Sequence, residues 1–197
     1  MRKLAVFLAV LIQFGCSKHS DPVEDMPPVS KYPGYKEYFI PKGANYSQQN
    51  EYHSFRAPEL NFSAIFDSSA IYQTKDPGNQ ADINKLYGVS DGNTHHQDNS
   101  ARFGWNWNGH AIQIHAYCYA GSVREFKWIG NVQPGEPHSY SIRIDNSHYI
   151  FQFDNKVEYM HREIRDSVLN GYSLYPYFGG DETAPHDIRI YLKETPQ

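Results

Sequence analysis

The stretch AIQIHAYCY, residues 111–119, decides which fold the sequence predicts. Ile, Ile, Ala and Cys occupy every second position, and Gln, His and two Tyr occupy positions between them. In a β-strand these two sets face opposite sides of the sheet. The stretch therefore predicts a strand with one apolar face for a core. Its other face carries amide, imidazole and phenol groups, which either pack under another layer or contact a ligand.

Short segments of similar character recur from residue 36 onward. Runs rich in β-branched and aromatic residues are separated by Gly, Pro, Asn and Asp, and few segments show a helical period. The expected strands are 36–40, 58–66, 100–107, 111–119, 123–130, 139–144, 148–154, 156–162, 172–178 and 186–193. Helical turns are expected only around 81–87 and 165–170. This pattern predicts an all-β, two-sheet antiparallel sandwich, and its long excursions favour a jelly roll over a meander.

The first residues have the composition of an export signal. Arg2 and Lys3 precede an apolar run, residues 4–12, that is too short to span a bilayer. The run ends in Gln13-Phe14-Gly15-Cys16, which resembles a bacterial lipoprotein signal. The resemblance implies a signal peptide over 1–16, lipidation of Cys16, and a lipid-anchored protein of the outer membrane or cell surface. The alternative is an ordinary signal peptide followed by an unrelated Cys.

The segment after Cys16 predicts a tether. Residues 17–34 contain several prolines and charges and few apolar side chains, which is typical of a flexible linker. Residues 35–197 then form one domain of ordinary size. With Cys16 lipidated, Cys118 is the only other cysteine, so the domain is held together by its core without a disulfide.

The charge balance argues against a nucleic-acid partner. The chain has 18 Lys and Arg against 22 Asp and Glu, a net charge of −4 that becomes −6 without Arg2 and Lys3. No basic run is present to neutralise phosphates. A membrane contact is expected through the lipid anchor alone, because no later stretch is long and apolar enough to span.

Segments near both ends of the domain resemble exported bacterial domains of the concanavalin A-like jelly-roll group. They are YFIPKG (38–43), YPYFGG (175–180) and APHDIRI (184–190). The resemblance implies that one curved sheet has a concave face that binds or cleaves sugars.

Alternation provides the candidate side chains for such a face. They are Arg102, Gln113, His115, Tyr117, Tyr119, Tyr175, Tyr177 and Arg189. Aromatic rings stack on the C–H face of a sugar, while amide, imidazole and guanidinium groups bind hydroxyls or a carboxylate. Alternatively, these side chains fill space under a covering loop, and each polar tip is bonded internally.

A sharper hypothesis concerns Gln113-Ile114-His115, which resembles the Q-[I/V]-H strand motif of alginate-lyase-like polysaccharide lyases. The resemblance implies that Gln113 and Arg102 neutralise a uronic acid carboxylate. His115 or a tyrosine, Tyr177 or Tyr175, would then remove the C5 proton while tyrosine protonates the leaving oxygen. The R-x-E-x-R strand and the Lys of the Y-x-K-x-G segment of that family are absent.

Metal and hydrolase chemistry are less well supported. No cofactor is indicated, and no spacing of His or Cys indicates a transition-metal site. A structural calcium ion would have to use carboxylates on long loops, namely Asp76, Asp82, Asp91 and Asp98. Asp181 and Glu182 lie in a Gly-Pro turn, and the E-x-D-x-x-E motif of related glucanases is absent, which argues against hydrolysis by a carboxylate pair.

The sequence therefore favours a carbohydrate-binding or accessory lipoprotein. Two alternatives remain open: a polysaccharide lyase, and a structural or adhesin-like domain that binds no glycan. A lyase requires its side chains to converge on one point, a binding module requires exposed rings along a groove, and a structural domain would have those rings covered.

Overall fold

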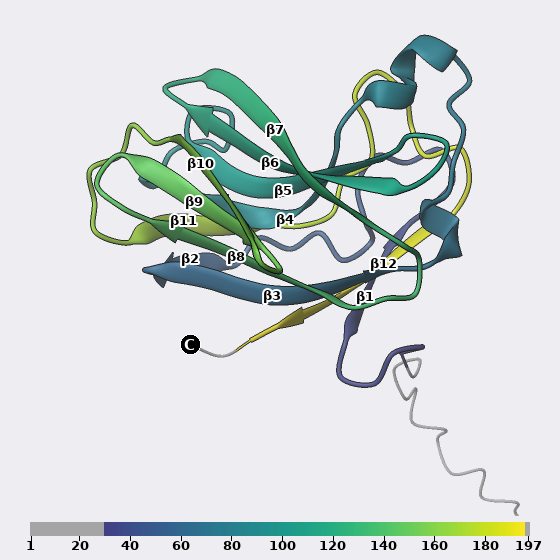
Figure 1. Cartoon of the computed structure of the whole chain (residues 1–197), viewed down its shortest axis with the longest axis horizontal. Coiled ribbons are helices and arrows are strands. Elements are labelled where there is room, and N and C mark those ends of the chain that lie inside the picture. The colour runs from purple at the N-terminus through teal and green to yellow at the C-terminus, as the bar shows by residue number, and fades with distance from the viewer. Residues whose placement is uncertain (1–29, 196–197) are drawn as a thin grey trace, which may run out of the picture.

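Two antiparallel six-stranded sheets stack face to face in the computed structural model, which describes residues 30–195 (Figure 1). The predicted all-β jelly-roll sandwich is confirmed. The expected signal segment with Cys16, and residues 17–29 of the expected tether, lie outside the described residues. No helix among residues 30–195 is long and apolar enough to cross a membrane.

The strand order follows from pairings between segments that are distant in sequence. The first sheet contains, in spatial order, β1 (Lys36–Ile40), β12 (Ile188–Glu194), β3 (Glu59–Phe66), β8 (His138–Ile144), β9 (His148–Phe153) and β10 (Lys156–His161). The second sheet contains β2 (Ser54–Ala57), β11 (Leu169–Leu174), β4 (Asn84–Ser90), β5 (Ser100–Trp107), β6 (Ile112–Ala120) and β7 (Val123–Val132). These crossovers make a jelly roll and not a meander.

The core lies between the two sheets and is rich in aromatic rings. Phe62 and Phe66 of β3 meet Phe103 and Trp105 of β5, with ring centroids 5.9 and 5.2 Å apart. Cys118 is buried in the same layer as a free thiol. The apolar parity of residues 100–107 and 111–119 therefore does face the core, as period two predicts.

The structure corrects the expected elements in two regions. Residues 81–87 are not a helical turn: the 3-10 helix η2 (Pro77–Ala81) ends there, and β4 follows. The alternation of β4 is interrupted by a bulge between Lys85 and Gly88, which hides the strand period. The strand β2 was also not expected.

The region after residue 164 differs as well. No helical turn forms over 165–170, because β11 begins at Leu169 and pairs with both β2 and β4. The expected strand 172–178 ends at Leu174, just before Pro176, which has no N–H to donate to a ladder. Beyond it, Tyr177 makes isolated bridges to Tyr46 and Lys85.

The end of the expected tether rests on the first sheet. The ring of Tyr32 packs edge-on against Tyr191 of β12 at 4.8 Å, and Lys31 Nζ lies 3.8 Å from Asp67. Lys31 and Tyr32, near the end of the expected tether, therefore contact the domain. The chain enters the sandwich beside β1 and β12 (Figure 1).

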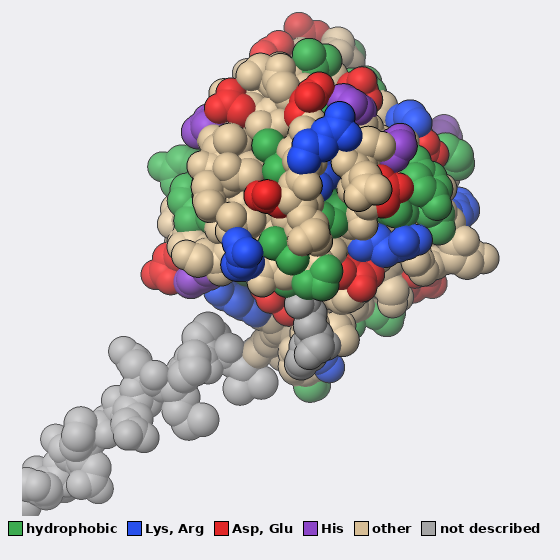
Figure 2. Space-filling view, turned by 90° about the vertical axis from the view of Figure 1, so that its left-hand side faces the viewer, with side chains coloured by type: hydrophobic (Ala, Val, Ile, Leu, Met, Phe, Trp, Pro, Cys, Tyr) green, Lys and Arg blue, Asp and Glu red, His purple; other side chains and the backbone are tan. Residues whose placement is uncertain are grey.

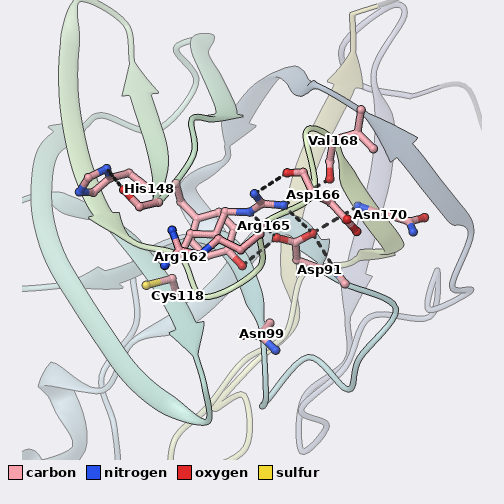
Figure 3. Close-up of polar contacts among 12 residues, drawn as sticks. Asp91, Asn99, Cys118, His148, Arg162, Arg165, Asp166, Val168 and Asn170 are labelled. Atoms are coloured by element: carbon pink, nitrogen blue, oxygen red, sulfur yellow. Dashed lines mark hydrogen bonds and ion pairs between the residues drawn. The ribbon is translucent and has the colours of Figure 1, made fainter.

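A buried ion pair joins the two sheets at one end of the sandwich (Figure 3). Arg162 Nε donates to Asp91 Oδ2 at 2.7 Å, and both side chains are fully buried. Asp91 also accepts from Tyr149 Oη, at 3.0 Å, and from the backbone N–H of Asn170, at 3.3 Å. Outside this buried cluster, the molecular face in Figure 2 shows acidic and basic side chains interspersed.

Candidate functional site

Strand pairing aligns the side chains on the outer face of the second sheet into transverse rows. One row consists of Tyr177, Lys85, Gly104, His115 and Trp128, and the next consists of Gly88, Arg102, Tyr117 and Phe126. A third row consists of Asn106, Gln113 and Asn131. Directly opposed residues of an antiparallel pair share a face, so these rows cover one continuous surface.

Two cavities hollow this face, and we call them together the groove. The first, of about 230 Å³, is lined by Tyr52, His96, Arg102, Leu174, Tyr175 and Tyr177. The second, of about 110 Å³, is lined by Ala81, Asp82, Ile83, Lys85, Tyr117, Arg124, Phe126 and Gly180. Tyr117 connects them, because its ring contacts the guanidinium of Arg102 at 5.4 Å and the ammonium of Lys85 at 5.0 Å.

Arg102 forms the floor of the first cavity and is only 8% exposed. Gly88 lies beside it on β4, where a Cβ atom would come within 2.3 Å of Arg102 Cβ. The glycine therefore allows the two strands to approach at the bulge.

The charge of Arg102 is poorly compensated. Its Nε is buried and has no hydrogen-bond partner within residues 30–195. Burial lowers the pKa of Arg102, and the groups that oppose this shift are phenol hydroxyls, those of Tyr117, Tyr119, Tyr52 and Tyr172. A buried cation that lacks hydrogen bonds is energetically unfavourable until an anion reaches it.

Tyrosines wall the first cavity. The ring of Tyr52 packs against those of Tyr172 and Tyr175, with centroids 4.9 and 5.2 Å apart. The hydroxyl of Tyr172 lies 3.1 Å from Nδ1 of His96. Burial, and next the nearby charge of Arg102, lower the pKa of His96 to about 4. His96 is therefore neutral at pH 7, and Arg102 is the cation of this cavity.

Two further cations reach the second cavity. Lys85 Nζ donates to the carbonyl oxygens of Ile83, at 2.5 Å, and Gly179, at 3.3 Å. Burial lowers the pKa of Lys85 to about 8, and repulsion from Arg102 and Arg124 contributes. No Asp or Glu occurs in the three rows described above, so the sheet surface of the groove is basic and aromatic, while the carboxylate of Asp82, on the loop before β4, also lines the second cavity.

Gln113 and His115 are connected through Asn106. His115 Nε2 lies 2.7 Å from Asn106 Oδ1, and Asn106 Nδ2 donates to Gln113 Oε1 at 3.4 Å. An amide oxygen can only accept, so this assignment places the proton of His115 on Nε2 and a lone pair on Nδ1. Nδ1 is buried without a partner in the described part of the chain, and burial lowers the pKa of His115 to about 4.

Most of the predicted candidates share this face, and one does not. Tyr175 and Tyr177 line the first cavity with Arg102, and Tyr119 lies on the same face next to Tyr117, opposite Arg124 of the edge strand β7. Arg189 is a correction: it belongs to β12 of the first sheet, where it makes an ion pair of 3.3 Å with Glu37.

The carboxylates considered for calcium have separate partners. Asp91 binds Arg162, Asp76 caps η2 through the N–H of Gly78, Asp82 accepts from the N–H of Asp181, and Asp98 accepts from Ser122 Oγ. Within residues 30–195, no three His, Cys, Asp or Glu side chains converge as metal ligands.

Glu182 is a loop anchor. Its carboxylate accepts from the backbone N–H groups of Asp76 and Lys75, and from Asn79 Nδ2, all within 3.0 Å. These bonds lower its pKa and fasten the loop that carries η2 to the loop before β12.

Several groove residues were not predicted, although the alternation of the sequence could have identified three of them. Arg124, Phe126 and Trp128 alternate along β7 on the side of Tyr117 and His115. Tyr52 and His96 lie on irregular segments, where no period marks which way a side chain points.

Comparisons with known proteins identify the fold. No family model matches the chain, and no curated protein matches it in sequence. Among solved structures, alginate lyase AlyC3 aligns with a TM-score of 0.55 at 9% identity, covering 82% of this chain and 74% of that one. An alginate lyase from Pseudomonas aeruginosa aligns at 0.54 and 8% identity, covering 85% and 88%. A glycoside hydrolase family 16 endo-glucanase from Bacteroides ovatus aligns at 0.52 and 13% identity, covering 82% and 80%. The chain therefore has the jelly-roll fold of these enzymes.

Proposed function

We propose that this protein binds an acidic polysaccharide along the groove of the second sheet. The observation that carries the proposal is Arg102: a buried guanidinium that pairs with no carboxylate of residues 30–195, surrounded by tyrosines, at the floor of an open cavity. A carboxylate or sulfate ester on a sugar would supply the missing hydrogen bonds, and planar oxygen pairs match the guanidinium fork.

The rest of the groove suits a glycan. Phenol rings offer apolar faces to the C–H groups of a pyranose, and their hydroxyls bind its oxygens. Lys85 and Arg124 extend the positive charge beyond Arg102, which favours a polymer with repeated negative charges over a single small anion. The exposed rings at the groove also argue against a purely structural domain, in which they would be covered.

The envelope location is part of the proposal. A chain lipidated at Cys16 would hold the domain at the outer membrane or cell surface through a short tether. The tether would join the sandwich beside the first sheet, where Tyr32 contacts Tyr191, so the groove on the second sheet would remain accessible to a soluble polymer. Lipidation of Cys16 is tested by metabolic labelling with a fatty-acid analogue and loss of the label in C16A.

The function is tested with the purified protein against acidic and neutral polysaccharides. The acidic set is alginate, polygalacturonate and chondroitin sulfate, and the neutral set is mixed-linkage glucan and laminarin. We expect ligand-induced thermal stabilisation with at least one acidic polymer, weakened by salt because the attraction is electrostatic, and none with the neutral polymers. Stabilisation by neutral polymers alone, or by none, would contradict the proposal.

A lyase activity is the second candidate, and His115 is the observation that favours it. Its Nδ1 is buried, has a free lone pair and no hydrogen-bond partner in residues 30–195, and the low pKa keeps the ring neutral at pH 7; a general base needs such a lone pair within reach of the proton that it removes. In the β-elimination, His115 would take the C5 proton, the C4–C5 double bond would form, and the bond from C4 to the glycosidic oxygen would break. Tyr177 lies on the same row but three strand spacings away, about 14 Å between backbones, so its side chain would have to extend over Lys85 and Gly104 to protonate that oxygen.

Ultraviolet absorbance separates the two candidates, because only elimination creates a conjugated double bond. Absorbance that grows with time on an acidic polymer and disappears in H115A would establish the lyase. Binding that persists in H115A without absorbance from the wild type would leave a binding module. The variant Y177F tests the acid separately, since it keeps the ring and removes the proton donor.

A further inference from the structure

A second feature of the groove lies on β7, which is an edge strand of the second sheet. Phe126 and Trp128 alternate along it, and they are 50% and 53% exposed. Their strand partners are Tyr117 and His115, which places both rings at the side of the groove. The edge-on contact between Phe126 and His115, at 6.3 Å, confirms the direction of Phe126.

The two rings are held in place although they are exposed. Trp128 Nε1 donates to Asn131 Oδ1 at 3.0 Å, which fixes the rotation of the indole. The ammonium of Lys156 lies 5.2 Å from the Trp128 ring, and the guanidinium of Arg124 lies 6.0 Å from the Phe126 ring. Exposing apolar ring surface to water is energetically unfavourable. Oriented rings with cations beside them suit a ligand that has both C–H faces and negative charge.

The rings lie beyond the Arg102 cavity on a line across the strands. Arg102, Tyr117 and Phe126 occupy one transverse row from β5 to β7. Adjacent strands are spaced by about 4.8 Å, so roughly 10 Å separates the backbone at Arg102 from that at Phe126. A saccharide whose charged ring binds Arg102 places its next ring over Tyr117, so a disaccharide does not reach Phe126, whereas a longer chain crossing the strands does.

We infer that Phe126 and Trp128 form a second sugar subsite, which stacks a further pyranose ring of the acidic polysaccharide whose charged group binds Arg102. This inference rests on the proposed function and deepens it, because it gives the ligand a direction across the strands of the second sheet. It also makes affinity depend on chain length. Arg124 and Lys156 provide the charge complement for an acidic ring at this subsite.

The test measures affinity against chain length by titration calorimetry. The probes are di-, tetra- and hexasaccharides of mannuronate and of galacturonate. In the wild type we expect the tetrasaccharide to bind at least about tenfold more tightly than the disaccharide. The double variant F126A/W128A should lose this gain and bind the disaccharide as the wild type does. W128F should retain part of the gain, because it keeps a ring at the position.

Tyr159 provides the matched control. It is a 51% exposed aromatic residue on β10 of the first sheet; its carbonyl oxygen accepts from Lys127 of β7, but its ring lines neither cavity, so Y159A removes a similar ring outside the groove and should preserve the gain. A length gain that survives in F126A/W128A, or a disaccharide affinity that falls with the tetrasaccharide affinity, would overturn the subsite alone. If the wild type bound neither these oligosaccharides nor any acidic polymer, the proposed function would be overturned as well. Equal thermal unfolding of the variants confirms that they fold.

Discussion

Arg102 and Arg162 are both buried arginines of this sandwich, and their surroundings differ completely. Arg162 Nε and Nη2 bind the carboxylate of Asp91, and Nη1 and Nη2 donate to the carbonyl oxygens of Asp166 and Val168 (Figure 3). Arg102 has tyrosine neighbours, and its Nε is unpaired within the described residues. Burial therefore does not distinguish a structural arginine from one available to a ligand, whereas the inventory of hydrogen bonds does.

The locations of the two arginines agree with this distinction. Asp91 and Arg162 lie where loops between the sheets meet, and their bonds hold the segment before β11. Arg102 lies in the middle of a sheet and opens into a cavity of about 230 Å³. A guanidinium that stabilised the fold would be expected to have its carboxylate in place, and Arg102 instead lines a cavity walled by tyrosines.

The largest expected effect is on stability at the paired arginine. D91N keeps the shape of the carboxylate but leaves Arg162 buried without a counter-charge. We expect the free energy of unfolding to fall by about 3–5 kcal/mol, as for other buried pairs that lose one partner. Urea denaturation measures the change. R102Q is the comparison, and it should change stability by less than about 1 kcal/mol, because no partner is left unpaired.

The double variant D91N/R162M sharpens the same test. Removing both charges should recover part of the loss, since the cost arises from one uncompensated charge and not from missing contacts. Equal destabilisation by D91N and R102Q would show that Arg102 is a structural residue after all.

The next largest effect concerns ligand binding at the unpaired arginine. R102Q should weaken binding of the acidic polysaccharide on the order of a hundredfold, since truncating one member of a buried charge pair costs about 2–5 kcal/mol. R102K keeps the charge without the planar fork and should bind with intermediate affinity. Calorimetry with the polymer that stabilises the wild type gives both values. Unchanged affinity in R102Q would place the ligand elsewhere.

A smaller effect is expected from His115 on the free energy of unfolding at low pH. Its pKa in the folded state is about 4, below the unfolded value of about 6.5, because burial disfavours the charged ring. The unfolded chain therefore binds more protons between these values, so the stability is complete above about pH 6.5 and is lost as the pH falls toward 4. H115Q should show a shallower decline over this window in urea titrations. His96, whose pKa burial also lowers to about 4, contributes to the slope that remains.

How much the sequence predicts differs between the strands and the groove. Period two places Arg102, Gln113, His115 and Tyr117 on one face, and the structure agrees. The same rule placed Arg189 with them, because alternation tells which side of a strand a residue occupies but not which sheet contains the strand. Sheet order depends on pairings such as β12 with β1 and β3, which no local pattern records.

The bulge in β4 explains why Lys85 was missed. Two residues of β4, Leu86 and Tyr87, oppose a single position of β5, so the alternation breaks in the middle of the strand. A seven-residue segment with a broken period resembles a helical turn, as residues 81–87 did. Bulges are common near functional sites. The bulge that interrupts the alternation of β4 begins at Lys85, which is the cation that β4 contributes to the groove.

The smallest expected effect follows from that cation. The pKa of Lys85 is lowered to about 8 by burial and by repulsion from Arg102 and Arg124, so its charge is lost as the pH rises from 7 to 9. Affinity for the acidic polysaccharide should fall severalfold over this interval in the wild type. K85R should keep its affinity, because arginine stays charged, and K85M should be weaker but insensitive to pH. A decline of equal size in K85R would assign the pH dependence to another group. Lys85 would then be only a packing partner of Tyr117, and the positive charge of the groove would reside with Arg102 and Arg124.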